Sequence, residues 1–263
     1  MTKTLLSAAR TLVSMHLTLG AAAANPGITL PLAEQERSEI DRSLGPGVLG
    51  EAVPALGITD PERYLDMKPV PRIYRVRSES GSETDQGFQL TPVTSAAGKR
   101  TWRYRQDGAE NGFIEQQPDG SFVMTGVEDA ETGAVTRYQP PEPLLLKSMN
   151  PGEERKLRMT IQVYDPARPS EVAHEGSLDV VYRYLGAYRL TLPAGTYDAV
   201  LMKSSFSGRV GPARLEDTQY RFFAPGAGLV ATIERRDVSA FLLYNAHIRE
   251  ARLLVGKSPS APH

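Results

Sequence analysis

Residues 190–200 read Leu-Thr-Leu-Pro-Ala-Gly-Thr-Tyr-Asp-Ala-Val, and residues 220–230 read Tyr-Arg-Phe-Phe-Ala-Pro-Gly-Ala-Gly-Leu-Val. In each stretch, strand-forming residues flank a turn that contains Pro and Gly. Proline presets the φ angle that a turn needs at its second residue, and glycine takes the positive φ that a side chain resists. Each stretch therefore predicts a β-hairpin, and the two hairpins organise the second half of the chain.

Short runs of alternating apolar and polar residues follow residue 71. Trp102 and Tyr104 alternate with Arg103 and Arg105, which predicts a strand with one buried face and one wet face. Comparable runs occur at 73–77, 113–117, 122–125, 158–164, 178–192, 196–206, 219–223, 229–235 and 241–255. Turn signals separate these runs, so we predict an all-β fold: a curved antiparallel sheet, half-barrel or sandwich, with a short helical amino-terminal segment.

The chain divides into four predicted segments: a signal peptide at 1–24, a helical and extended segment at 25–70, a β-sheet domain at 71–256 and a polar tail at 257–263. Residues 32–44 place apolar side chains at helical spacing, and Asp60 followed by Pro61 predicts the start of a second short helix. Residues 140–143 read Pro-Pro-Glu-Pro and predict a loop, because proline cannot donate to a sheet ladder.

The first 24 residues predict export. Lys3 and Arg10 are their only charges, an apolar run follows, and residues 21–24 are four alanines suited to signal-peptide cleavage. Polar residues within the run also allow an amphipathic helix. We expect a periplasmic or secreted protein without a transmembrane anchor, because nowhere do about 18 apolar residues run uninterrupted.

Composition argues against several classes of function. The chain has no cysteine and a formal net charge of −1, so disulfides, thiolate zinc sites and electrostatic binding of nucleic acid are not expected. His174 and His247 lie in no metal-binding motif; we expect His174 in a turn and His247 on the wet face of a strand. Ser205 to Gly208 reads as a loop without a catalytic base. We predict no cofactor, no metal and no enzymatic activity.

The two Pro-Gly turns resemble a signature found in a broad group of exported bacterial proteins of unknown function. That group has a Val-Pro-Ala-Gly-Thr-Phe turn and a Trp-Phe-Ala-Pro-Gly turn on successive hairpins of a curved sheet. Here Leu192, Tyr197 and Phe222 replace the usual valine, phenylalanine and tryptophan. The resemblance covers about residues 185–236. It implies an extracytoplasmic β-sheet domain, in some members similar to the half-barrels of lipoprotein carriers, and it transfers no catalytic residues.

The apolar face of the predicted sheet is the remaining candidate for function. Its expected ligand-binding residues are Met159, Met202, Phe206, Phe222 and Tyr244. A filled core is the simpler interpretation, and an apolar hollow for a lipid such as an acyl chain is the alternative. We predict a non-enzymatic envelope protein that holds such a ligand. A structural or interaction module that binds an envelope protein through a sheet edge is the alternative function, and a hydrolase is a distant third.

The signal-peptide prediction has a direct test. We expect cleavage near Ala24, so that amino-terminal sequencing of protein from the envelope or the medium starts at Asn25 or a neighbour. Recovery of unprocessed Met1 from that fraction would contradict export by this route.

Overall fold

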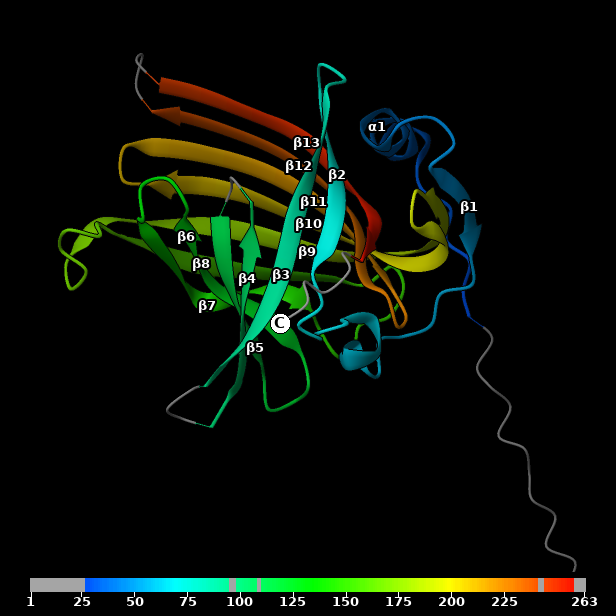
Figure 1. The fold of residues 1–263 in the computed structure, drawn as a ribbon, viewed down its shortest axis with the longest axis horizontal. Coiled ribbons are helices and arrows are strands. Elements are labelled where there is room, and N and C mark those ends of the chain that lie inside the picture. The colour runs from blue at the N-terminus through cyan, green and yellow to red at the C-terminus, as the bar shows by residue number, and fades with distance from the viewer. Residues whose placement is uncertain (1–26, 95–97, 108–109, 241–243, 258–263) are drawn as a thin grey trace, which may run out of the picture.

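The computed structural model describes residues 27–94, 98–107, 110–240 and 244–257 (Figure 1). The helices are α1 (Glu34–Leu44) and the 3-10 helix η1 (Pro61–Tyr64). The strands are β1 (Leu49–Val53), β2 (Arg72–Ser78), β3 (Glu83–Thr94), β4 (Arg100–Gln106), β5 (Glu110–Gln116), β6 (Phe122–Asp129), β7 (Val135–Leu145), β8 (Glu154–Tyr164), β9 (Val172–Leu192), β10 (Gly195–Val210), β11 (Ala213–Ala224), β12 (Gly228–Ala240) and β13 (Tyr244–Lys257). The predicted signal peptide lies outside the described residues. Neither described helix is long and apolar enough to cross a membrane.

The strands form one antiparallel sheet that closes on itself. The order is β1-β9-β10-β11-β12-β13-β2-β3-β4-β5-β6-β7-β8, and β9 also pairs with β8, so that β2 to β13 make a closed barrel (Figure 1). The prediction of an all-β fold with a short helical segment is therefore confirmed. The sheet is neither a half-barrel nor a sandwich, because β8 and β9 join its two sides.

Closure depends on the length of β9, which spans 21 residues. Its first part pairs with β8 from Val172 to Arg183, and its last part pairs with β1 from Ala187 to Leu190. The register against β10 shifts where these parts meet, and Gly186 has φ 123° there. A bulge of this kind bends a strand and lets it serve two neighbours.

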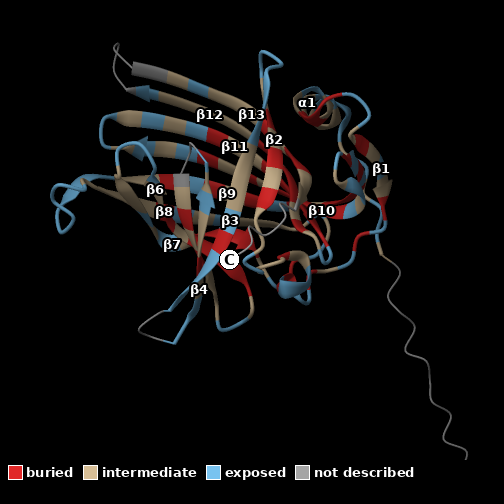
Figure 2. Ribbon diagram, in the orientation of Figure 1, coloured by how far each residue is buried: buried red, intermediate tan, exposed pale blue. Residues whose placement is uncertain are grey.

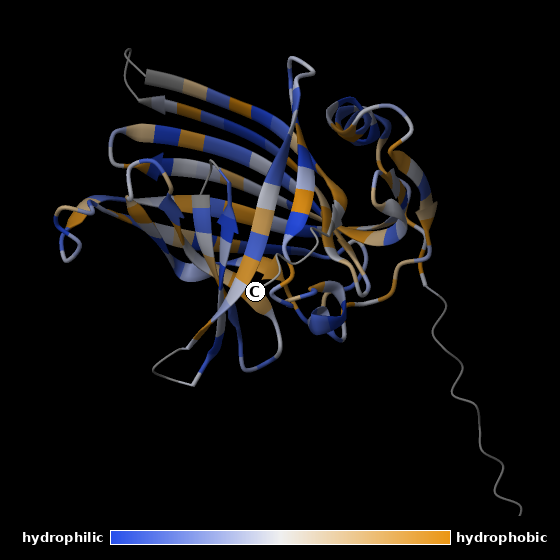
Figure 3. Ribbon diagram, in the orientation of Figure 1, coloured by the Kyte–Doolittle hydropathy of each residue, from blue (hydrophilic) through white to orange (hydrophobic). Residues whose placement is uncertain are grey.

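The apolar face of β11 to β13 points out of the barrel. Along these strands hydrophobic and hydrophilic residues alternate (Figure 3). Tyr220, Phe222 and Ile233 pack with Ile40 and Leu44 of α1 in one buried cluster. Helix α1 thus covers an outer face, as the buried ends of the strands near it show (Figure 2).

Polar contacts attach α1 to the same face. Glu36 accepts hydrogen bonds from Lys203 at 2.5 Å and from the Tyr220 hydroxyl at 3.0 Å. The helix predicted over 32–44 is confirmed, and it ends at Gly45, which has φ 98°. Asp60 caps η1 as predicted, because its carboxylate accepts from the backbone N–H of Glu62.

Both predicted Pro-Gly hairpins are present. The first joins β9 to β10, where Gly195 has φ 128°, and the second joins β11 to β12, where Gly226 has φ 72°. Both values lie in the region that side chains disfavour. These turns position β9 to β12 relative to one another.

The predicted loop at 140–143 is wrong, because these residues belong to β7. Pairing of β7 with β8 stops at Gln139, while Glu142 and Pro143 still pair with β6. Pro140 and Pro141 therefore stand where the strand has no β8 partner to receive an N–H, which is how a strand tolerates proline.

Other local predictions also need correction. Ser205 to Gly208 is not a loop but part of β10, and His174 is not in a turn but pairs with Val163 in the ladder between β8 and β9. At both places, pairing with neighbouring strands outweighed the local preference of these residues for turns. Strands β1 and β3 were not predicted, because their sequences lack a regular alternation. His247 is exposed on β13, as expected.

Gly195→Val and Gly226→Val should each lower the free energy of unfolding by about 1 to 3 kcal/mol, because valine is strained at positive φ. Denaturant titration followed by circular dichroism measures this change. Gly256→Val is the control: Gly256 has no positive φ, and an added Cβ would meet no atom within 4 Å. If the two turn variants were as stable as wild type and as the control, the role of the two turns would be contradicted.

Candidate functional site

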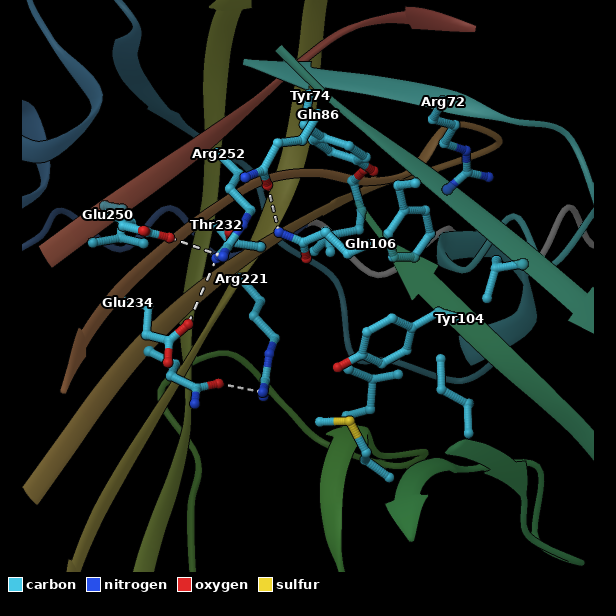
Figure 4. Close-up of a pocket in the computed structure, with 18 of the residues that line it drawn as sticks. Arg72, Tyr74, Gln86, Tyr104, Gln106, Arg221, Thr232, Glu234, Glu250 and Arg252 are labelled. Atoms are coloured by element: carbon cyan, nitrogen blue, oxygen red, sulfur yellow. Dashed lines mark hydrogen bonds and ion pairs between the residues drawn. The ribbon is translucent and has the colours of Figure 1, made fainter. Parts of the chain in front are cut away.

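The interior of the barrel contains a cavity of about 390 Å³ that is partly open to solvent (Figure 4). Strands β2 to β7 supply one wall and β11 to β13 supply the opposite wall. Residues 65–67, which follow η1, contribute to the rim. Its volume lies within the range of about 300 to 1,000 Å³ that is usual for small-molecule sites.

The wall from β2 to β7 is mostly apolar and aromatic. Phe88 stacks on Tyr104 with 5.6 Å between ring centroids and meets Tyr74 edge-on at 5.7 Å. The Tyr74 hydroxyl donates to the carbonyl of Leu229 at 2.6 Å, which fixes the ring. The apolar residues that line the cavity from both walls include Leu65, Met67, Phe88, Leu90, Ile114, Met124, Leu144, Phe223 and Leu229.

The wall from β11 to β13 is polar, and its side chains form rows across the strands. Arg221 pairs with Thr232, which pairs with Arg252. The next row places Gln219, Glu234 and Glu250 side by side in the same way. The basic row lies directly beside the acidic row. Side chains that are neighbours in adjacent strands are close enough to interact.

Arg221 is the most deeply buried cation of this wall. Its guanidinium donates to Glu142 of β7 at 2.6 Å, and the two side chains are 9% and 5% exposed. It also contacts Gln219 and lies 3.5 Å from the Ser204 hydroxyl. Burial lowers the pKa of Arg221, but Glu142, Tyr182 and Tyr104 together raise it more, so that the pKa is raised overall.

Arg252 lies at the edge of the polar wall, on β13 next to β2. Its guanidinium lies 2.9 Å from the Glu250 carboxylate and 3.5 Å from that of Glu234. Gln86 and Gln106 bring their amides within 2.8 Å of each other beside it (Figure 4). When the amide of Gln106 is turned over, its oxygen accepts from Arg252 Nε at 2.8 Å. This end of the cavity therefore offers both donors and acceptors.

Asp217 extends the polar wall by one more row. It pairs in register with Arg236, whose Nε lies 3.3 Å from one carboxylate oxygen, and Gln219 donates to the same oxygen at 2.7 Å. Burial raises the pKa of Asp217 to about 6, despite the opposing effect of Arg236. Asp217 does not line the cavity.

The residues predicted from sequence lie in different places. Met159 and Phe206 share one buried cluster, Met202 belongs to a second, and Phe222 belongs to the outer cluster under α1. Phe222 pairs with Leu201, so it faces away from Met202. The Tyr244 side chain lies outside the described part of the structure. None of the other four lines the cavity, and ligand binding by the five stays a prediction.

None of the cavity-lining residues, neither the apolar ones nor the charged ones, was predicted from sequence to bind a ligand. Gln219 and Arg221 alternate with the apolar Tyr220 and Phe222, a pattern that indicates a wet outer face for the polar pair. The arrangement is the reverse, because α1 covers the apolar face from outside. The one available signal was the repetition of paired charges at matching positions of three successive strands.

The described residues contain no group of three or more His, Asp or Glu suited to hold a metal ion. No protein-family model and no curated protein matches the sequence. Solved structures of similar fold include one described as an exported protein with a YmcC-like fold from Bacteroides fragilis, 13% identical, with a TM-score of 0.45 over 78% of this chain and 100% of that one. Another, described as a lipoprotein from Parabacteroides distasonis, is 13% identical, with a TM-score of 0.36 over 74% of this chain and 98% of that one.

The raised pKa of Asp217 predicts a pH-dependent stability. The fold favours the protonated carboxyl, so its contribution is lost as pH rises from about 4 to about 6, by on the order of 2 to 3 kcal/mol. Asp217→Asn should remove this loss, and the stability difference between variant and wild type should grow over that pH interval. Urea titrations at several pH values measure it.

Asp237→Asn provides a control of opposite sign. His247 and Arg249 lower the pKa of Asp237, so its ionised form stabilises the fold and the variant should lose stability at neutral pH. A pH-independent difference between wild type and Asp217→Asn would contradict the assignment.

Proposed function

We propose that the protein is a non-enzymatic binding protein, exported from the cytoplasm, that holds a small amphiphilic molecule in the barrel. One observation carries the proposal: a closed barrel contains a cavity with an aromatic, apolar wall opposite a polar wall (Figure 4). A filled barrel would need no such division. An apolar body fits against Phe88, Tyr104 and Leu229, and a polar end fits against Arg252 and its neighbours.

The polar wall supports a binding role because its buried ion pairs contribute little to the stability of the fold. Buried ion pairs such as Arg221–Glu142 give little net stability, since desolvation offsets the attraction, and apolar replacements are often as stable or more so. Several such groups in rows inside a barrel are better explained by recognition of a polar ligand group.

The apolar wall supplies the affinity. Burial contributes about 0.8 kcal/mol for each CH₂, so a chain with about ten buried methylenes reaches about micromolar affinity. An acyl or other alkyl chain is a suitable apolar part, as expected from the sequence. It would lie against the apolar cavity residues, many of which share a buried cluster with Met202, and not within the separate cluster around Met159.

The chemistry of the buried polar groups favours binding over catalysis. A serine nucleophile needs a general base within hydrogen-bond reach, and the neighbour of Ser204 is the cation Arg221. Asp217 has the pKa of a possible acid or base, but it is held by Gln219 and Arg236 and does not line the cavity. Among the residues that the structure describes, these two sites therefore give the hydrolase alternative no support.

Binding through a sheet edge has less support than binding in the barrel. The pairing of β8 with β9 uses the edges that an open sheet would expose. The short strand β1 pairs with β9 and is the end of the strand order, so it is the place where an added strand would bind.

The proposal is tested by titration with the uncharged fluorophore N-phenylnaphthylamine. We expect saturable binding, and Leu229→Trp should weaken it by about tenfold or more, because the indole fills the cavity. Ile114→Phe is a second, smaller filling variant. Val93→Trp is the matched control, since Val93 is exposed on β3 and does not line the cavity.

Circular dichroism and thermal melts establish that each variant is folded. Absence of saturable binding by folded wild-type protein, or unchanged binding by both filling variants, would refute the proposed function.

A further inference from the structure

We propose that the polar end of the ligand is an uncharged group with hydroxyl or amide functions, as in a monoacylglycerol, and is neither a carboxylate nor an ammonium group. This inference rests on the proposed function and specifies its ligand class. It follows from how the charges of the polar wall are already paired.

Each cation of the wall has a carboxylate partner within the barrel. Arg221 binds Glu142 at 2.6 Å, and Arg252 binds Glu250 at 2.9 Å. Arg236, in the next row, lies 3.3 Å from Asp217 and also contacts a carboxylate of the acidic row at 2.6 Å. An anionic ligand would therefore meet arginines whose charge is already compensated.

The charges also balance across the wall as a whole. Three arginines, at 221, 236 and 252, face four carboxyl groups, at 142, 217, 234 and 250, which gives a sum of −1. Elsewhere in the lining, Arg72 pairs with Asp66 at 3.1 Å, and Asp129 and Glu131 are exposed carboxylates at the end of β6. A ligand carboxylate would enter this space without a counter-charge, and a ligand ammonium would have to compete with the arginines for carboxylates that they already bind. Burying an unpaired ion costs far more than burying a neutral polar group.

Unused hydrogen-bonding capacity remains for a neutral group. A carboxylate accepts at up to about four positions, and the ion pairs use only some of them. Gln86 and Gln106 offer amide N–H and C=O groups beside Arg252, and either orientation of the Gln106 amide makes hydrogen bonds. A hydroxyl or amide both donates and accepts, so it can join this network without disturbing an ion pair.

The apolar wall sets the position of that group. Phe88 and Tyr104 stack at one side, while Gln106, which pairs with Phe88 in register, belongs to the polar end. The change from aromatic to amide side chains therefore occurs between neighbours on adjacent strands. A ligand whose chain lies on the aromatic pair places its polar group beside Gln106 and Arg252 (Figure 4).

Displacement of N-phenylnaphthylamine tests the inference with three ligands of equal chain length: monododecanoylglycerol, dodecanoate and dodecylammonium, all below their micelle concentrations at pH 8. We expect the glycerol ester to bind at least about tenfold more tightly than either ion, a difference of about 1.4 kcal/mol.

Glu250→Gln sharpens the test because it removes a partner of Arg252. Dodecanoate should then bind about tenfold more tightly than to wild type, so that its affinity rises relative to that of the glycerol ester. Glu216→Gln is the matched control: it makes the same charge change on β11, but Glu216 is exposed and pairs with Arg214 outside the cavity. Its selectivity should equal that of wild type.

Equal or tighter binding of either ion to wild-type protein would overturn the inference and leave the proposed function standing. Failure of all three ligands to displace the fluorophore would likewise overturn it. If the fluorophore itself does not bind, the proposed function fails first.

Discussion

Pairing between β8 and β9 is the constraint on which the rest of the structure depends. It converts a long antiparallel sheet into a barrel, and a barrel has an interior whose volume is set by its strands. The bulge near Gly186 lets β9 leave β8 and continue beside β1. The same strand therefore closes the barrel around the cavity and also holds the amino-terminal segment, which includes the outer helix.

The barrel distributes its side chains in an unusual way. On β11 to β13, Tyr220 and Phe222 pack under α1 on the outside, while Arg221, Glu234 and Arg252 line the interior. Ion pairs and amides make this interior possible, because a buried charge without a partner would be far too costly. Arg221 and Glu142, which join β11 to β7, show how two opposite walls share one such pair. Strand pairing thus decides which wall of the cavity is polar and which is apolar.

Much of the fold could be predicted from the sequence, whereas the site could not. Positive φ at Gly195 and Gly226, the helix that buries Ile40 and Leu44, and most strands follow from local residue patterns. The prolines of β7 were misread, because their tolerance depends on where pairing with β8 stops. Phe222 and Met202 were assigned to one face, although their registers place them on opposite faces.

The sequence by itself determined that most strands alternate, where the two Pro-Gly turns lie and which residues of one strand share a face, because these properties depend on near neighbours and a period of two. Only the tertiary structure decided which face became the interior. That choice depends on α1 covering the side of Tyr220 and Phe222, and on cross-strand register placing Arg221, Thr232 and Arg252 in one row. Both are contacts between residues far apart in sequence, and local patterning carries no information about them.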